Sequence, residues 1–102
     1  MADYNYLNEK GQVTLVFRGS LTISEVSEIK EIFNKAIAES ENILINHDEC
    51  ESFDLSYIQL VISAYRTAKE WRKSLKVISK ENDLFKQTLK DVGFKIDEIF
   101  LN

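Results

Sequence analysis

The sequence predicts a small α/β domain, with a mixed β-sheet, an N-terminal hairpin and about three helices packed mainly on one face of the sheet. Runs rich in β-forming residues alternate with runs whose apolar residues recur every three or four positions, as on one face of a helix. The chain has 102 residues, of which 44% are hydrophobic, and this is enough for one modest core. No proline, internal repeat or low-complexity tract marks a linker. We therefore expect a single domain over residues 1–102.

The first segments favour a hairpin. Residues 4–8 alternate aromatic or apolar side chains with polar ones, and residues 12–18 are rich in β-formers. Gly11 lies between the two runs and suits a turn between antiparallel strands. Gly19 is expected to end the second strand.

A helix and a short strand should follow. Ser24 offers a hydroxyl cap and Glu28 an early negative charge, and the helix is expected to run to about Ser40. Residues 42–46 form a short apolar run that is typical of a strand covered on at least one face. An acidic loop over residues 47–53 is then expected to lead into the next helix. The apolar stripe of the first helix should comprise Val26, Ile29, Ile32, Phe33, Ala36 and Ile37.

The second half of the chain repeats this alternation. Its longest amphipathic run begins after Asp54, and the pattern predicts a helix, a strand, a second helix and a short final strand. Gly93 lies where a C-terminal cap glycine is expected. The predicted elements are a helix over residues 55–72 with Leu55, Ile58, Ile62 and Tyr65 on its stripe, a strand over 74–79, a helix over 83–91 capped by Asn82 or Asp83, and an apolar tail over 94–101.

Composition excludes several classes of function. The chain has 17 acidic and 13 basic residues, a net charge of −4 and no dense basic block, so nucleic acid and anionic membrane are unfavourable partners. Cys50 is the only cysteine and His47 the only histidine, which rules out an internal disulfide and leaves too few soft ligands for zinc. No apolar run approaches the roughly 20 residues that span a bilayer. We expect a cytoplasmic protein that binds another protein, with no cofactor, no metal and no membrane insertion.

The single histidine and cysteine lie in the predicted acidic loop. His47 with its acidic neighbours is more typical of a solvated loop than of a metal cluster, and we expect the loop to shape a binding rim. Cys50 is expected to be a buried, inert thiol, because a nucleophile needs a base beside it. No phosphate-binding glycine loop and no catalytic triad can be assembled, so enzymatic activity is not expected.

Two groups of side chains on the long helix have ordinary structural explanations. Tyr65 and Trp71 are expected in the core or at its edge, as aromatic residues usually are. A basic group near the helix end is expected to reflect favourable placement of cations at a helix C-terminus. That group comprises Arg66, Lys69, Arg72 and Lys73.

The start of the long helix is the candidate working site. Asp54 has the short side-chain acceptor of a helix cap, and Ser56 then falls in the first turn. Backbone N–H groups there have no intrahelical partner and the helix dipole favours negative charge, so a phosphate on Ser56 would be tolerated. It would add roughly 1.5 to 2 negative charges to the surface. From these residues alone, Ser56 is better explained as an ordinary first-turn hydroxyl than as a regulated site, because Ser is favoured near helix starts for local reasons.

This stretch resembles the STAS domains of anti-sigma factor antagonists and sulphate transporters, whose members read a strand, a loop and then Asp-Ser-Ser-Gly at a helix start. Residues 43–56 have that spacing without a gap, and Gly19-Ser20-Leu21-Thr22 is similar to the family's Gly-x-Leu-Asp/Thr turn. Residues 58–61 and 75–78 extend the likeness over nearly the whole chain. The resemblance implies that Ser56 matches the serine phosphorylated by a partner kinase, which is also the anti-sigma factor.

Three positions depart from the family pattern. Leu55 replaces the first serine, Asn46 replaces a common aspartate, and Tyr57 replaces the glycine. A glycine lets a partner approach closely, whereas a tyrosine narrows access or adds an apolar contact. Family members without the kinase cycle act as adaptors in chemotaxis gene clusters or in bacterial lipid-transport complexes.

We therefore predict a non-enzymatic protein-binding module and keep two main hypotheses. In the first, phosphorylation of Ser56 by a serine kinase that is also an anti-sigma factor switches binding. In the second, the module is a static adaptor or subunit and Ser56 is never modified. A third hypothesis is an anion cradle for a small molecule, which a thermal-shift screen would detect. The predicted partner surface comprises Ser20, Leu21, Thr22, Ile23, Ser24, Asp54, Tyr57 and Leu60.

Overall fold

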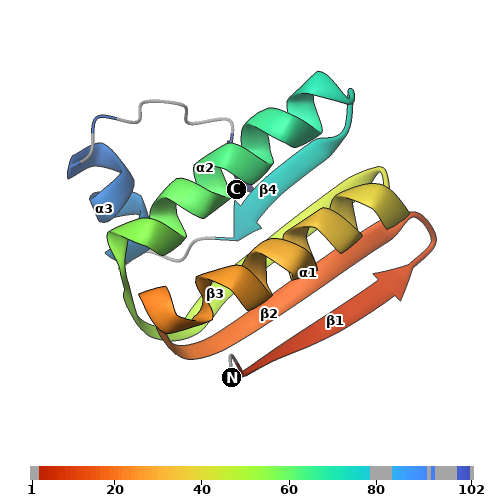
Figure 1. Ribbon diagram of the computed structural model, residues 1–102. Coiled ribbons are helices and arrows are strands. Elements are labelled where there is room, and N and C mark those ends of the chain that lie inside the picture. The colour runs from red at the N-terminus through yellow and green to blue at the C-terminus, as the bar shows by residue number, and fades with distance from the viewer. Residues whose placement is uncertain (1–2, 79–83, 92, 94–98, 102) are drawn as a thin grey trace.

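The computed structural model describes residues 3–78, 84–91, 93 and 99–101. Strands and helices alternate along the chain in the predicted order, and a short strand closes the sheet (Figure 1). The elements are β1 (Asp3–Glu9), β2 (Gln12–Leu21), the 3₁₀ turn η1 (Ile23–Glu25), α1 (Val26–Glu39), β3 (Asn42–Phe53), α2 (Leu55–Glu70), β4 (Ser74–Ile78), α3 (Leu84–Asp91) and β5 (Phe100–Leu101).

The strands form one mixed sheet in the order β1-β2-β3-β4-β5. β1 runs antiparallel to β2, and each later pair in the sheet is parallel. Parallel neighbours need a crossover, and α1 and α2 provide it between β2, β3 and β4. Both helices lie side by side on the same face of the sheet (Figure 1). The predicted fold class is confirmed.

The hairpin closes on two residues. Lys10 and Gly11 both have positive φ, of 48° and 81°, and they join Glu9 directly to Gln12 in the ladder. Two left-handed residues give the turn whose twist matches a pair of antiparallel strands. The carbonyl of Gly11 also accepts hydrogen bonds from the backbone N–H groups of Glu41 and Asn42, at 3.1 and 3.2 Å. The turn therefore fixes the start of β3 beside the start of β2.

The core lies between the sheet and the helices. Alternate residues of β2, β3 and β4 point to this face, and the helices bury matching stripes against them. Burying one such side chain contributes about 1.5–3 kcal/mol. Predicted stripe residues of the first helix are buried, except that Val26 is only half-buried. The fully buried set includes Val13, Leu15, Phe17, Ile29, Ile43, Ile45, Ile58, Val61 and Val77.

The predicted ends of two strands are wrong, and both errors shorten the strand. β2 continues through Gly19 to Leu21, and β3 continues through the predicted acidic loop to Phe53. Pairing between the two strands keeps these polar residues extended despite their weak β-propensity. Register shifts interrupt the ladder on either side of Gly19, whose φ of 75° suits a bulge rather than a strand end.

The predicted helix starts are partly corrected. Ser24 does not cap α1, because it lies inside η1 and Glu25 occupies the N-cap position, with no side-chain cap hydrogen bond. Asp54 does occupy the N-cap position of α2, but its side chain makes no cap hydrogen bond either. α2 ends at Glu70, two residues before the predicted end. The proposed caps Asn82 and Asp83 and tail residues 94–98 lie outside the described residues.

Candidate functional site

The carboxyl ends of β2 and β3 bring the predicted turn and the predicted helix start together. The backbone N–H of Asp54 donates to the carbonyl of Leu21 at 3.0 Å. Ser20 pairs with Ser52 in the ladder, and Leu21 with Phe53. We call the exposed and half-buried residues Ser20, Thr22, Ser24, Asp54 and Leu55 the strand-end surface.

The turn before α1 is held by local hydrogen bonds. The hydroxyl groups of Thr22 and Ser24 share a hydrogen bond at 2.8 Å, and the N–H of Glu25 donates to the carbonyl of Thr22 at 3.0 Å. Ser20 and Ser24 are exposed and Thr22 is half-buried. These three residues can therefore present hydroxyl groups to a partner. The backbone of Ile23 belongs to η1, and its side chain lies outside the described set.

Three predicted surface residues point elsewhere. Leu21 is 1% exposed and Tyr57 is 0% exposed, so neither side chain offers atoms to a partner. Leu60 is half-buried and packs against the core. The prediction that Leu21 and Tyr57 contribute exposed contacts is therefore wrong. Their periodic spacing along β2 and α2 places them on the face that the sheet and helices share.

Ser56 lies in the first turn of α2 but does not present its hydroxyl to solvent. The residue is half-buried, and its Oγ is buried with no hydrogen-bond partner among the residues that the structure describes. A hydroxyl in that state costs about 1–3 kcal/mol. Phosphate transfer to Ser56 therefore requires its side chain to rotate outward first. This feature was not predictable from helix spacing.

Tyr57 reaches under the strand-end surface to His47. The hydroxyl of Tyr57 and Nε2 of His47 form a hydrogen bond, and both residues are buried. Burial raises the pKa of Tyr57 well above its ordinary value, with Cys50 adding a smaller effect, so the phenol stays protonated. Nδ1 of His47 is buried without a partner among the described residues. Within the described part of the chain, one ring nitrogen of His47 is therefore hydrogen-bonded and the other is not.

An aromatic cluster encloses this pair. The ring of His47 lies 4.5 Å from that of Phe85 and 5.0 Å from that of Phe53, centroid to centroid. Phe53 stacks on Tyr57 at 5.7 Å with an interplanar angle of 16°. Phe17 contacts both polar residues from β2. The cluster supports the start of α2 from beneath.

His47 was expected in a solvated acidic loop, and this is wrong. It continues the inward alternation of Ile43 and Ile45 along β3 and is 5% exposed. Burial lowers its pKa from 6.5 to about 3, so the imidazole is neutral at neutral pH. Asp48, Glu49 and Glu51 remain exposed around it and form an acidic rim. Among the described residues no group of His, Cys, Asp or Glu has metal-binding geometry.

Cys50 lies on the same strand and is half-buried. Its Sγ donates to the carbonyl of Phe17 at 3.3 Å. Burial raises the pKa of the thiol to about 12, with the charge of Glu49 as a second cause, so the thiolate is scarce at neutral pH. This agrees with the prediction of an unreactive thiol.

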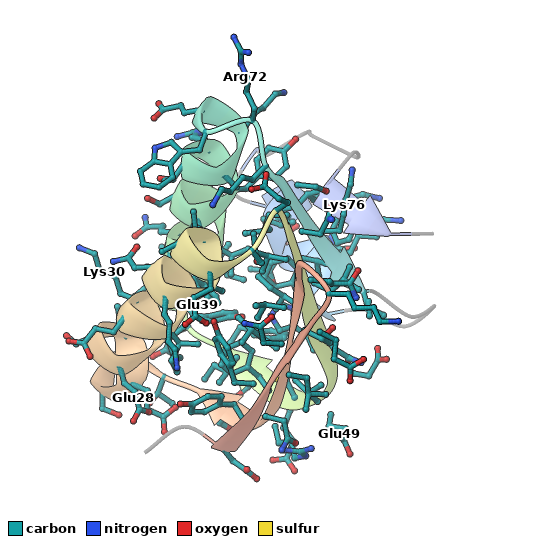
Figure 2. The ribbon with its side chains drawn as sticks, turned by 90° about the vertical axis from the view of Figure 1, so that its right-hand side faces the viewer. Glu28, Lys30, Glu39, Glu49, Arg72 and Lys76 are labelled. Carbon is teal, nitrogen blue, oxygen red and sulfur yellow. The ribbon has the colours of Figure 1, made fainter. Side chains whose placement is uncertain are left out.

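The acidic rim contains one basic side chain. The guanidinium group of Arg18 in β2 lies 3.2 Å from Oε2 of Glu49 and 3.6 Å from Oδ1 of Asp3. It also donates a hydrogen bond to Oδ1 of Asn5. Glu28 and Glu49 both lie at the lower end of the molecule in Figure 2. The strand-end surface is therefore bordered mainly by negative charge.

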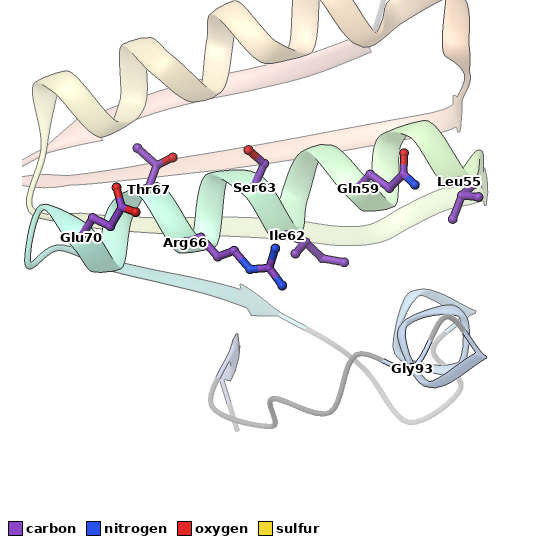
Figure 3. A pocket seen from close by; sticks show the side chains of 8 residues that line it. All are labelled: Leu55, Gln59, Ile62, Ser63, Arg66, Thr67, Glu70 and Gly93. Carbon is purple, nitrogen blue, oxygen red and sulfur yellow. The ribbon is translucent and has the colours of Figure 1, made fainter.

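Leu55 is a surface residue that sequence reasoning missed. It is 53% exposed at the first position of α2, where the periodic pattern had placed it on the buried stripe. From Leu55 an open groove of about 550 Å³ follows the outer face of α2 (Figure 3). The groove is lined by Leu55, Gln59, Ile62, Ser63, Arg66, Thr67, Glu70 and Gly93. The signal that could have found it is the polar run on the face opposite Tyr57, which Leu55 interrupts.

Known proteins share this fold. A family model described as "Mlab, STAS domain" matches residues 6–100. The Bacillus cell fate determinant SpoIIAA in its phosphorylated form has a TM-score of 0.78 at 15% identity, over 97% of this chain and 89% of that one. An anti-sigma-factor antagonist (STAS) domain protein from Planctomyces limnophilus has a TM-score of 0.73 at 24% identity, over 98% and 87%. No curated protein sequence matches the chain. At such low sequence identity, these TM-scores establish a common fold and nothing more specific.

Proposed function

The chain belongs to the STAS domain family, and on that premise we propose that it is a non-enzymatic regulatory module that binds a protein partner through its strand-end surface. Family membership supports protein binding as the general role. The exposed hydroxyl groups of Ser20 and Ser24 and the exposed side chain of Leu55 supply a mixed polar and apolar contact area. Within the described residues no helix is long and apolar enough to cross a membrane. A cytoplasmic location stays a prediction.

Of the two mechanisms, we favour the static adaptor, in which Ser56 is not modified. The observation that carries this choice is the buried Oγ of Ser56, which a kinase could reach only after the side chain rotates. Tyr57 adds to it, because its inward side chain anchors the first turn of α2. The resemblance to family members that act as adaptors without a kinase cycle supports the same choice.

The second candidate is a phosphorylation switch at Ser56, with a serine kinase that is also an anti-sigma factor as the partner. The position of Ser56 in the first turn of α2, two residues after Asp54, favours this mechanism. The likeness in fold to SpoIIAA, which was solved with and without phosphate, also supports it. Phosphate there would add charge beside Asp54 and block docking through charge and desolvation cost.

One experiment separates the two mechanisms. The protein is purified from its native host and Ser56 is examined for phosphate by mass spectrometry, while wild type, Ser56→Ala and Ser56→Asp serve as paired baits. The adaptor predicts no phosphate and capture of the same partner by wild type and Ser56→Ala. Phosphate on Ser56, together with a kinase captured by wild type and lost by Ser56→Asp, would establish the switch.

The docking surface needs its own control. Leu55→Glu is expected to reduce capture of the partner at least about tenfold, because a charge replaces an exposed apolar contact at the centre of the surface. Leu7→Glu is the matched control, since Leu7 is 49% exposed on β1, away from α2. Equal capture by Leu55→Glu and Leu7→Glu would move the interface away from the strand-end surface.

A further inference from the structure

The opposite end of the molecule carries an exposed tryptophan. Trp71 is the only tryptophan in the chain, and its exposed fraction of 59% is the largest of any large apolar side chain described. It directly follows α2, and its backbone N–H donates to the carbonyls of Thr67 and Ala68 at 3.2 and 3.1 Å. The expectation that Trp71 belongs to the core or its edge is wrong. A tryptophan left in water is enriched among the residues that dominate protein interfaces.

The residues after Trp71 hold it in place. Arg72 has a φ of 59°, a left-handed conformation that costs a non-glycine residue about 1–2 kcal/mol. Nζ of Lys73 donates to the carbonyl of Ile37 in α1 and lies 5.6 Å from the centre of the Trp71 ring. The indole therefore has Lys73 over its ring while most of its surface stays accessible. Arg72 projects away from the body at the upper end of Figure 2.

A basic hollow lies beside this tryptophan. Lys69, Lys73 and Lys76 line a space of about 230 Å³ along α2 and the start of β4. Tyr65, Ser74 and Leu75 complete the described lining. Lysine side chains around one hollow favour carboxylate groups of an approaching molecule, although the ammonium of Lys73 also donates to the carbonyl of Ile37. We call Lys69, Trp71, Arg72, Lys73 and Lys76 the basic pole.

Positive charge is concentrated in the stretch of chain that forms the basic pole. Residues 69–76 contain four basic residues and one acidic residue, which leaves nine basic and sixteen acidic residues in the rest of the chain. Placement at helix C-termini explains two of the four basic residues, because Lys69 lies in the last turn of α2 and Nζ of Lys73 donates to the carbonyl of Ile37 in the last turn of α1. It does not account for Arg72, which follows α2, or for Lys76, which lies in β4.

We propose that the basic pole is a second docking surface, which binds an acidic segment of a partner protein whose carboxylates enter the hollow and whose apolar side chain covers Trp71. The pole lies at the starts of the parallel strands, because Ser74 pairs with Asn42 and through it with Gln12. The strand-end surface is at the opposite end of those strands. One module can thus engage two partners at once.

A polypeptide fits this pole better than an anionic bilayer does. Glu70 is exposed within the same stretch of chain, and Glu41 is exposed beside it, since its carbonyl accepts from the backbone N–H of Ser74 at 2.9 Å. Both carboxylates would repel a flat, negatively charged surface. The hollow is concave, which suits single side chains rather than a planar array of headgroups.

The only tryptophan of the chain reports on this binding directly. The full chain is titrated with a synthetic peptide of about ten residues that holds Asp and Glu around one leucine, and Trp71 fluorescence is followed. We expect a blue shift, with a Kd that rises at least about tenfold between about 0.05 and 0.3 M salt. A peptide with Asn and Gln in place of the acids is the first control and should leave the emission unchanged.

Charge reversal separates the pole from the net charge of the protein. Lys69→Glu with Lys76→Glu should weaken peptide binding at least about tenfold, whereas Lys30→Glu with Lys90→Glu, two exposed lysines elsewhere, should change it less than about twofold. Replacement by glutamine serves if a reversal variant fails to fold. Four outcomes overturn the proposal: no response to the acidic peptide, an equal loss in both pairs, a shift only with vesicles of anionic phospholipid, or self-association of the protein at low salt without peptide.

Discussion

The two ends of the parallel strands handle their polar side chains in opposite ways. At the carboxyl ends, His47 and Tyr57 lie in an aromatic cluster and support the strand-end surface from below. At the strand starts, the basic pole exposes Trp71, Lys69 and Arg72, while Lys73 and Lys76 are half-buried. Burial couples a group to the stability of the fold, while exposure couples it to binding. Substitutions of similar chemistry should therefore change unfolding at one end and partner affinity at the other.

The largest effect is expected at Tyr57. Tyr57→Gly restores the residue that the family resemblance places beside the serine, yet it removes a fully buried ring and leaves His47 without its described hydrogen bond. We expect a loss of about 4–5 kcal/mol in the free energy of unfolding, measured by denaturant titration. Tyr57→Phe keeps the ring, and should lose only about 1–3 kcal/mol. A loss below about 1 kcal/mol for Tyr57→Gly would show that the cluster does not support α2.

The second effect is a dependence on pH. The pKa of His47 is about 3 in the folded state and 6.5 when unperturbed, so between these values the unfolded chain binds a proton that the folded chain does not. Stability from this group is therefore complete above pH 6.5 and falls as the pH drops, by about 2 kcal/mol at pH 5.

His47→Gln tests this assignment because glutamine can still bond to the hydroxyl of Tyr57 and does not titrate. The variant should lose the slope of unfolding free energy between about pH 6.5 and pH 5, although it is less stable at neutral pH. Lysine variants at the basic pole should keep the slope. If His47→Gln retains the wild-type slope, the histidine is protonated more easily than its burial indicates.

The smallest effect is expected at Arg72 and has opposite signs for stability and binding. Arg72→Gly removes a side chain from a left-handed position, so the free energy of unfolding should rise by about 0.5–1 kcal/mol. It also removes one cation of the basic pole, and affinity for the acidic peptide should fall a few fold. Thermal unfolding and Trp71 fluorescence measure the two changes on one sample. A variant that is both less stable and equally good at binding would contradict the contrast between the two ends.

Most of the fold followed from local patterns. The hairpin turn at Gly11, the stripe of α1 and the starts of β3 and β4 all rest on spacing rules that hold within a single element. The ends of β2 and β3 did not follow, because pairing between neighbouring strands keeps weak β-formers extended. Such pairing is a tertiary effect that single-sequence spacing does not report.

The candidate site was located correctly along the chain but oriented wrongly. The long helix has two overlapping apolar series, one that includes Leu55 and Ile62 and one that includes Tyr57 and Val61, and only packing decides which is buried. The predicted stripe is right for Ile58 and Tyr65, which are buried, but it wrongly took Leu55 for a buried residue and Tyr57 for a surface residue. His47 shows the opposite case, because the period-two series Ile43, Ile45, His47 was already in the sequence and predicts an inward side chain.

The bond between Tyr57 and His47 also constrains how this sequence can diverge. A change to glycine at position 57 would leave the buried imidazole of His47 without its hydrogen bond to the tyrosine hydroxyl. The two positions should therefore change together among related chains. Relatives with glycine beside the serine should carry an apolar residue where this chain has His47. Paired substitution at these two positions would then distinguish members whose first helical turn can be modified from members in which a buried hydrogen bond holds that turn to the core.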